Sequence, residues 1–156
     1  MLFSSLESAG SGGSPAGQQY IVFKQNTRSS SFEGYNLSKN RIAGGDVLEF
    51  LVSSAQGQVV QLQSTTRVAT GVWNHVAGVR GSNFVQLYVN GQLENQTNVS
   101  FAQDYGSFPL YFGTSGQSYW DHKFNGRLDE VSLYNRALSS GEVAAIYAAG
   151  AAGKCK

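Results

Sequence analysis

A loop in the last third of the chain holds the side chains best suited to bind a ligand. This loop, predicted over 114–123, contains in succession Tyr119, Trp120, Asp121 and His122. Flat aromatic rings stack on the apolar face of a pyranose, while polar groups beside them hydrogen-bond its hydroxyls. Together with Tyr105, these four residues are therefore predicted to bind carbohydrate. The alternative is that Trp120 folds back and covers the edge of the fold.

Asp129 is a second candidate, because its surroundings are predicted to be apolar. In the strand predicted over 127–135, alternation places Asp129 on the same face as Val131 and Leu133. A carboxylate that points into apolar surroundings must be paired, hydrogen-bonded or bound to a metal. Asp129 is therefore predicted to be either structural or a metal ligand.

For His75, the sequence favours a structural role over a catalytic one. It alternates onto one face with Ala77 and Val79, and no motif supplies the nucleophile or carboxylate that a catalytic histidine would need. We interpret His75 as a hydrogen-bonded core histidine. Trp73, two residues earlier, is also assigned to the core.

The elements that position these residues are predicted to be almost entirely β-strands. Short runs alternate apolar with polar residues, and the joints between them contain Gly or Asn. Strands are predicted over 2–6, 19–25, 34–39, 47–53, 59–64, 72–80, 84–89, 110–113 and 127–135. Residues 1–18 contain a loop-like stretch, and 95–106 is interpreted as a long excursion without clean alternation.

Two local signals are more specific. Asn90-Gly91 predicts a type I′ turn, which brings Val89 opposite Gln92 and starts a further strand. Apolar residues then recur at helical spacing over 138–149, where Ser139 and Glu142 have the spacing of a capping box. Gly150 ends this predicted helix, and the tail 150–156 is expected to fray.

Several motifs appear together in the second half of the chain. They are GVWNHVA at 71–77, LYVNG at 87–91, FNGRLDEV at 124–131 and LYNRALS at 133–139, followed by Glu142. In this order they resemble the concanavalin A-like lectin/glucanase superfamily, and within it the laminin G-like jelly-roll domains. The resemblance implies one domain over 1–156, an all-β jelly-roll sandwich of two antiparallel sheets with a short C-terminal helix.

The resemblance also bears on metal binding and on catalysis. Related jelly rolls hold Ca²⁺ through carboxylates and carbonyls, so Asp129, Asp104 and Asp121 are the candidate calcium ligands, and Ca²⁺ is the only cofactor considered. The glucanases of the superfamily place catalytic carboxylates in an E-x-D-x-E pattern, which this sequence lacks. The chain is therefore predicted not to be an enzyme, and a degenerate glycoside hydrolase is only the third interpretation.

The composition of the chain gives no support for binding to nucleic acid or for insertion into a membrane. The 156 residues have a formal net charge of +1, which gives no electrostatic case for nucleic acid, and no apolar run approaches the ~20 residues of a membrane span. The first hypothesis is a non-catalytic carbohydrate-binding module. The second is a protein-interaction or adhesion module without a sugar site.

The ends of the chain add three further expectations. The segment around Phe3 begins the chain where family domains usually have an earlier strand, so an open N-terminal strand edge is predicted to allow a homodimer. The start has no signal-peptide pattern, yet the resemblance implies an extracellular or cell-surface location. Cys155 has no partner for an internal disulfide, because it is the single cysteine.

Overall fold

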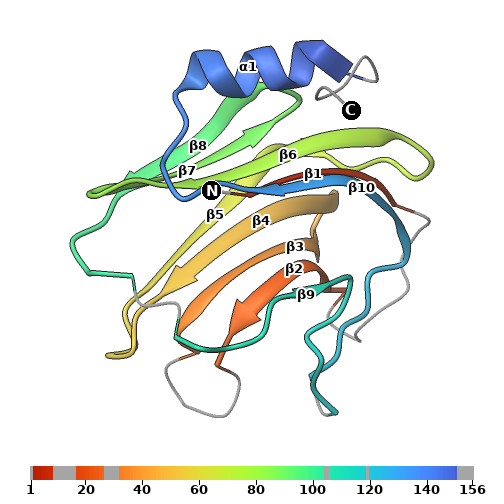
Figure 1. Ribbon diagram of the computed structural model, residues 1–156. Coiled ribbons are helices and arrows are strands. Elements are labelled where there is room, and N and C mark those ends of the chain that lie inside the picture. Colours follow the sequence, from red (N-terminus) through yellow and green to blue (C-terminus); the bar gives the residue numbers. More distant parts are fainter. Residues whose placement is uncertain (1, 9–16, 27–31, 104–105, 119, 151–156) are drawn as a thin grey trace.

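Two antiparallel sheets face each other and one helix lies on top of them (Figure 1). The computed structural model describes residues 2–8, 17–26, 32–103, 106–118 and 120–150. All the neighbouring strands within each sheet run antiparallel, as the predicted jelly-roll sandwich requires. The predicted fold class is confirmed.

Sheet A lies under the helix. In spatial order its five strands are β10 (Gly126–Leu133), β1 (Leu2–Ser8), β6 (Trp73–Arg80), β7 (Phe84–Val89) and β8 (Gln92–Asn98). The N-terminal strand β1 therefore pairs on both sides, with β10 and with β6. The predicted open N-terminal edge is wrong, because the last strand of the chain returns to cover it.

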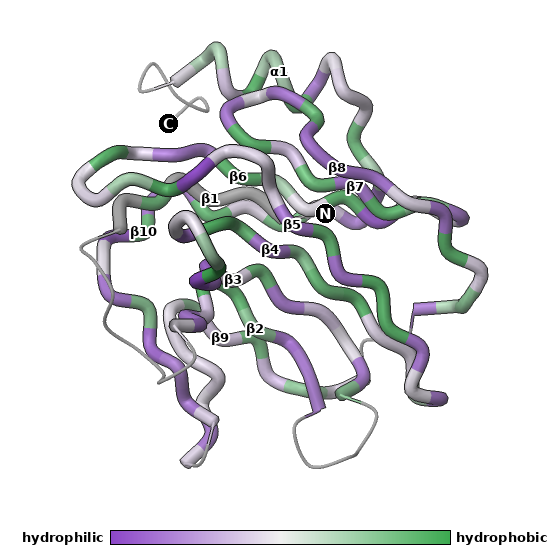
Figure 2. Tube along the Cα trace, turned by 180° about the vertical axis from the view of Figure 1, so that it is seen from behind, coloured by the Kyte–Doolittle hydropathy of each residue, from purple (hydrophilic) through white to green (hydrophobic). Residues whose placement is uncertain are grey.

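Sheet B forms the other layer of the sandwich. In spatial order its strands are β5 (Val59–Arg67), β4 (Gly45–Ser53), β3 (Gly34–Ile42), β2 (Gln19–Gln25) and β9 (Tyr111–Phe112). Apolar and polar residues both occur along these strands (Figure 2), and in β3 the polar Asn36 and Ser38 alternate with Tyr35 and Leu37. One face of sheet B thus joins the core, and the other face presents polar side chains away from sheet A.

The core fills the space between the sheets. Leu37, Leu48, Phe50 and Val52 of sheet B meet inward residues of sheet A, among them Val76, Val85 and Leu87. The Phe50 ring of sheet B packs against Gly78 of sheet A, where an added Cβ would come within 2.6 Å of the ring. Glycine at this position lets an aromatic ring pack directly on the opposite backbone.

The helix α1 (Ser140–Ala149) covers the outer face of sheet A. Val143 and Leu138 are buried there against Ala77, Val79 and Tyr88. The predicted capping box is present: the backbone N–H of Glu142 donates to Ser139 Oγ, and the N–H of Ser139 donates to the Glu142 carboxylate. In the described part of the chain, no helix has the length and apolarity needed to cross a membrane.

The predicted type I′ turn is also present. Asn90 and Gly91 have φ angles of 50° and 78°, and Val89 pairs with Gln92. The predicted excursion over 95–106 is wrong at its start, because β8 continues to Asn98. This strand is polar on both faces since it forms an edge of sheet A, where neither face must be fully buried.

Two expectations about side-chain direction are wrong for local reasons. Trp73 is 45% exposed, because it starts β6 on the outer face of sheet A. Asp129 is exposed because Glu130 has a φ of 52° and forms a bulge, in which two residues of β10 oppose one residue of β1. The Asp129 carboxylate accepts a hydrogen bond of 2.8 Å from the Glu130 backbone N–H.

Candidate functional site

The loop 114–123 is held against the start of β2 by backbone hydrogen bonds. The N–H of Gly113 donates to the Ile21 carbonyl at 2.9 Å before the loop begins. After the loop has turned back, the N–H of Tyr20 donates to the His122 carbonyl at 2.8 Å. Both ends of the loop are thus fixed to the edge of sheet B.

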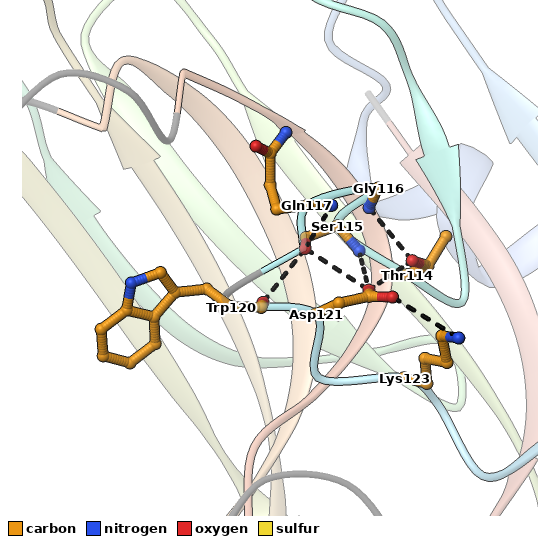
Figure 3. A network of polar contacts seen from close by, with 7 residues as sticks. All are labelled: Thr114, Ser115, Gly116, Gln117, Trp120, Asp121 and Lys123. Carbon is orange, nitrogen blue, oxygen red and sulfur yellow. Dashed lines mark hydrogen bonds and ion pairs between the residues drawn. The ribbon is translucent and has the colours of Figure 1, made fainter.

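The Asp121 carboxylate organises the interior of this loop (Figure 3). Its Oδ1 accepts hydrogen bonds from Thr114 Oγ1, from the Ser115 backbone N–H at 2.9 Å and from Ser115 Oγ at 3.4 Å. Its Oδ2 lies 3.7 Å from the Lys123 ammonium. Burial alone would raise the pKa of Asp121, but these donors and Lys123 hold it below its usual value.

Trp120 points away from this network (Figure 3). Its side chain is 51% exposed, while its carbonyl accepts a hydrogen bond of 3.0 Å from Ser115 Oγ. The backbone of Trp120 is therefore fixed and its indole is presented to solvent. The alternative in which Trp120 folds back over the edge of the sandwich does not hold.

His122 connects Trp120 to the sheet. Its ring lies 5.8 Å from the Trp120 ring in an edge-on arrangement and 5.4 Å from the Tyr20 ring in a parallel one. Its Nδ1 is 3.4 Å from Gln18 Oε1. Burial lowers the pKa of His122, although the charge of Asp121 opposes this, so the imidazole is predominantly neutral at pH 7.

Tyr20 begins a row of polar side chains across the outer face of sheet B. The strand register aligns Tyr20 with Ser38, Ser38 with Glu49 and Glu49 with Gln63. The Glu49 carboxylate accepts hydrogen bonds from Gln63 at 3.0 Å and from Asn40 at 3.3 Å. Burial and the nearby charge of Glu49, with a smaller effect from Asp121, raise the pKa of Tyr20 to about 12. Its hydroxyl thus stays protonated as a donor.

Two acceptor atoms on this face lack a hydrogen-bond donor among the described residues. One is Asn36 Oδ1 and the other is Ser38 Oγ, and both residues are buried. The orientation of the Asn36 amide is set by its neighbours: Gln25 donates through Nε2 to the Phe32 carbonyl, so its Oε1 accepts from Asn36 Nδ2 at 2.8 Å. Water or a ligand hydroxyl would satisfy both atoms.

This row of polar side chains on sheet B was not predicted from the sequence, although the sequence of β3 contains part of the pattern. Asn36, Ser38 and Asn40 alternate with Tyr35, Leu37 and Lys39, which indicates a polar face. The alignment with Tyr20, Glu49 and Gln63 depends on the register of four strands, which the sequence does not state.

Of the three predicted calcium ligands, only Asp121 and Asp129 belong to the described residues. Across the described ranges, no group of three or more His, Cys, Asp or Glu side chains is arranged to hold an ion. Asp121 Oδ1 accepts hydrogen bonds from Thr114 and Ser115 and its Oδ2 faces the Lys123 ammonium, so this carboxylate is satisfied without a metal cation. Asp104, Tyr105 and Tyr119 lie outside the described residues.

Solved structures with the same fold include proteins studied with sugars. A heptameric pentraxin from Limulus polyphemus has a TM-score of 0.71 at 15% identity, covering 96% of this chain and 69% of its own. A sialidase CBM40 domain from Ruminococcus gnavus, bound to α2,3-sialyllactose, has a TM-score of 0.70 at 15% identity, covering 94% and 80%. Domain 4 of an extracellular GH43 arabinanase from Geobacillus stearothermophilus, complexed with arabinotriose, has a TM-score of 0.64 at 18% identity, covering 92% and 64%.

Sequence comparison gives the family. No curated protein sequence matches the chain. A family model described as the concanavalin A-like lectin/glucanases superfamily matches residues 11–144, which include most of both sheets and the loop around Trp120. The motifs at 71–77, 87–91 and 124–131 occupy β6, the β7–β8 turn and β10. The chain therefore belongs to the concanavalin A-like lectin/glucanase superfamily, as a laminin G-like jelly-roll domain.

Proposed function

We propose that this domain is a non-catalytic carbohydrate-binding module whose ligand contacts Trp120. The observation that supports this most directly is the half-exposed indole on a loop that Asp121 holds in place. A ring fixed in this way can stack on a pyranose without a further loss of loop entropy. The sialyllactose complex of the CBM40 neighbour and the arabinotriose complex of the arabinanase domain support the same ligand class.

The polar row on sheet B extends the proposed site beyond one aromatic ring. Tyr20 lies against His122, and the row that follows contains donors and acceptors of the kind that sugar hydroxyls need. We propose that the ligand stacks on Trp120 and hydrogen-bonds His122. Gln63, at the far end of the row, would be reached by a longer oligosaccharide. Calcium is not required in this arrangement, and the location is proposed to be extracellular.

A glycan array followed by titration calorimetry tests this proposal. The array should include sialyllactoses and arabino-oligosaccharides, because similar structures were solved with these sugars. Trp120→Ala is expected to weaken binding of the best glycan by about tenfold to a hundredfold, which corresponds to ~1.4–2.8 kcal/mol, because aromatic side chains are among the residues that dominate binding energy. The matched control is Trp73→Ala, which removes a similarly exposed tryptophan from the outer face of sheet A.

Each outcome of this experiment is decisive. Loss of binding in Trp120→Ala with retention in Trp73→Ala supports the site. Equal affinity in both variants would place the sugar elsewhere, and binding of no glycan by the parent protein would overturn the proposed function.

The second candidate function, a protein-interaction or adhesion module, is favoured by a separate apolar surface. Trp73, Leu93 and Tyr147 are each more than two-fifths exposed. His75 links two of them, since its ring lies 5.8 Å from the Tyr147 ring and it follows Trp73 along β6. If Trp73→Ala rather than Trp120→Ala abolished a measured interaction, adhesion through sheet A would replace sugar binding.

A further inference from the structure

Glu49 places a buried negative charge within the polar row of sheet B. The residue is 1% exposed, and its carboxylate accepts hydrogen bonds from the neutral amides of Gln63 and Asn40. No described Lys, Arg or His side chain forms an ion pair with it. A buried carboxylate that is held by amides alone keeps its negative charge uncompensated, and weak screening lets that charge act over several ångströms.

Two basic residues of β3 are turned away from this row. Lys39 and Arg41 alternate with Ser38 and so lie on the opposite side of the strand. Both side chains donate there to the Asp46 carboxylate. Their charges are therefore matched to another carboxylate on the other side of the sheet.

Three further basic residues border the row without pairing with Glu49. Arg67, at the end of β5, lies over the β3–β4 turn, where its guanidinium is 3.9 Å from the position of a Cβ on Gly44. Lys123 lies 3.7 Å from the Asp121 carboxylate. Burial lowers the pKa of His122, which leaves its imidazole predominantly neutral at pH 7.

The negative charge acts on the neighbouring tyrosine. Burial is the main cause that raises the pKa of Tyr20 to about 12, and the charges of Glu49 and Asp121 add to it. Between Tyr20 and Glu49 in the register, Ser38 Oγ has no hydrogen-bond donor among the described residues. The row is thus negative and short of donors where the proposed ligand would cross it.

We propose that this face selects positively charged sugars over negatively charged ones, so that its ligand is an oligosaccharide with free amino groups. Glu49 is too deeply buried to touch the ligand, and its charge acts across Gln63 and Asn40, which are partly exposed. An ammonium group supplies three donors and the missing positive charge, whereas the carboxylate of a sialic acid is repelled. The inference rests on the proposed function and adds a charge preference to it.

Suitable probes are a tetrasaccharide of β1,4-linked glucosamine, its fully N-acetylated counterpart and sialyllactose. In a buffer in which the amines are protonated, calorimetric titration is expected to show the glucosamine oligomer binding about tenfold more tightly than the N-acetylated one, with sialyllactose weakest. Glu49→Gln keeps the shape of the side chain and removes its charge. It is expected to remove this tenfold preference, whereas a merely structural role of Glu49 would weaken the two oligomers alike.

Two further variants support this test. Glu130→Gln is the matched control, because it removes the same charge from β10 of sheet A and is expected to leave the preference unchanged. Gln63→Lys adds a cation to the polar row and is expected to shift the preference towards sialyllactose. This variant tests the role of charge even where Glu49→Gln does not fold.

The outcomes separate this inference from the proposed function. Equal affinity for the free and acetylated oligomers, tightest binding of sialyllactose, or an unchanged preference in Glu49→Gln or Gln63→Lys would each overturn the inference. So would the absence of glucosamine-oligomer binding by a protein that binds another glycan through Trp120. In all of these cases the sugar site itself would stand, whereas binding of no glycan at all would overturn the proposed function and this inference together.

Discussion

The imidazole of His122 lies parallel to the phenol ring of Tyr20, with centroids 5.4 Å apart and a 6° angle between the planes. Tyr20 belongs to β2 and His122 to the loop that carries Trp120, so the stack joins the loop to the sheet. Burial of the imidazole lowers the pKa of His122. The contact therefore depends on the neutral form of the histidine.

Folding stability is expected to fall as the pH drops below about 6.5, the ordinary pKa of histidine. Because the pKa of His122 is lower in the folded state, the unfolded state takes up a proton first, and the contribution of His122 is lost as the pH falls towards the folded pKa. Well above pH 6.5, as at pH 7.5, both states are predominantly neutral and the contribution is present in full. Urea unfolding at pH 7.5 and pH 5.5 measures this difference.

His122→Gln serves as the control for this titration. The variant has no ionisable group at this position, so its loss of stability between the two pH values should be smaller than that of the parent protein. Identical pH dependence in the two proteins would show that His122 does not titrate as inferred.

Calcium is expected to leave the thermal unfolding midpoint unchanged relative to excess EDTA. Asp121 is committed to donors within its loop, and Asp129 is exposed beside its own bulge. A cation bound only by the folded state would add about 2.7 kcal/mol at a hundred times its dissociation constant, which moves the midpoint by several degrees. A clear rise in millimolar calcium would contradict this expectation, and separate Asp104→Asn and Asp129→Asn variants would then identify the ligands.

The parts of the fold that depend on local chemistry could be predicted. The Asn90-Gly91 turn and the Ser139 and Glu142 cap are fixed by residues a few positions apart, and both are confirmed. The position of β1 could not be predicted in this way, because its two partners are strands far along the chain. One edge of β1 pairs with β6 and the other with β10, and both of these strands come much later in the chain.

The candidate site, too, could be predicted only in part from the sequence. The density of aromatic and polar residues around Trp120 marked the loop as a candidate, but the sequence left open whether the indole is exposed or folds back, and the structure shows it half exposed. The role of Asp121 as the centre of the loop required the positions of Thr114 and Ser115 in space. Asp129 was misjudged because strict alternation fails at Glu130, and a single positive φ turns the carboxylate to solvent.

A buried ion pair at the β3–β4 hairpin is expected to contribute strongly to stability. The Lys39 side chain is fully buried, and its ammonium lies 2.5 Å from the Asp46 carboxylate. Burial would raise the pKa of Asp46, but the hydrogen bonds from Arg41 and Lys39 lower it, so the carboxylate is ionised near pH 7. Asp46→Ala removes the carboxylate that lies against the fully buried Lys39 ammonium, and we expect a loss of ~3–5 kcal/mol.

Arg41 provides the matched control, because it contacts the same carboxylate from an exposed position. Its side chain is 50% exposed and its Nε lies 2.7 Å from Asp46 Oδ1, so Arg41→Ala should cost less than about 1 kcal/mol. Adding Lys39→Met to Asp46→Ala removes the buried positive charge as well and should restore most of the stability. Urea unfolding of the three variants distinguishes the cost of the buried Lys39 charge from that of lost packing, since lost packing alone would not be restored by Lys39→Met.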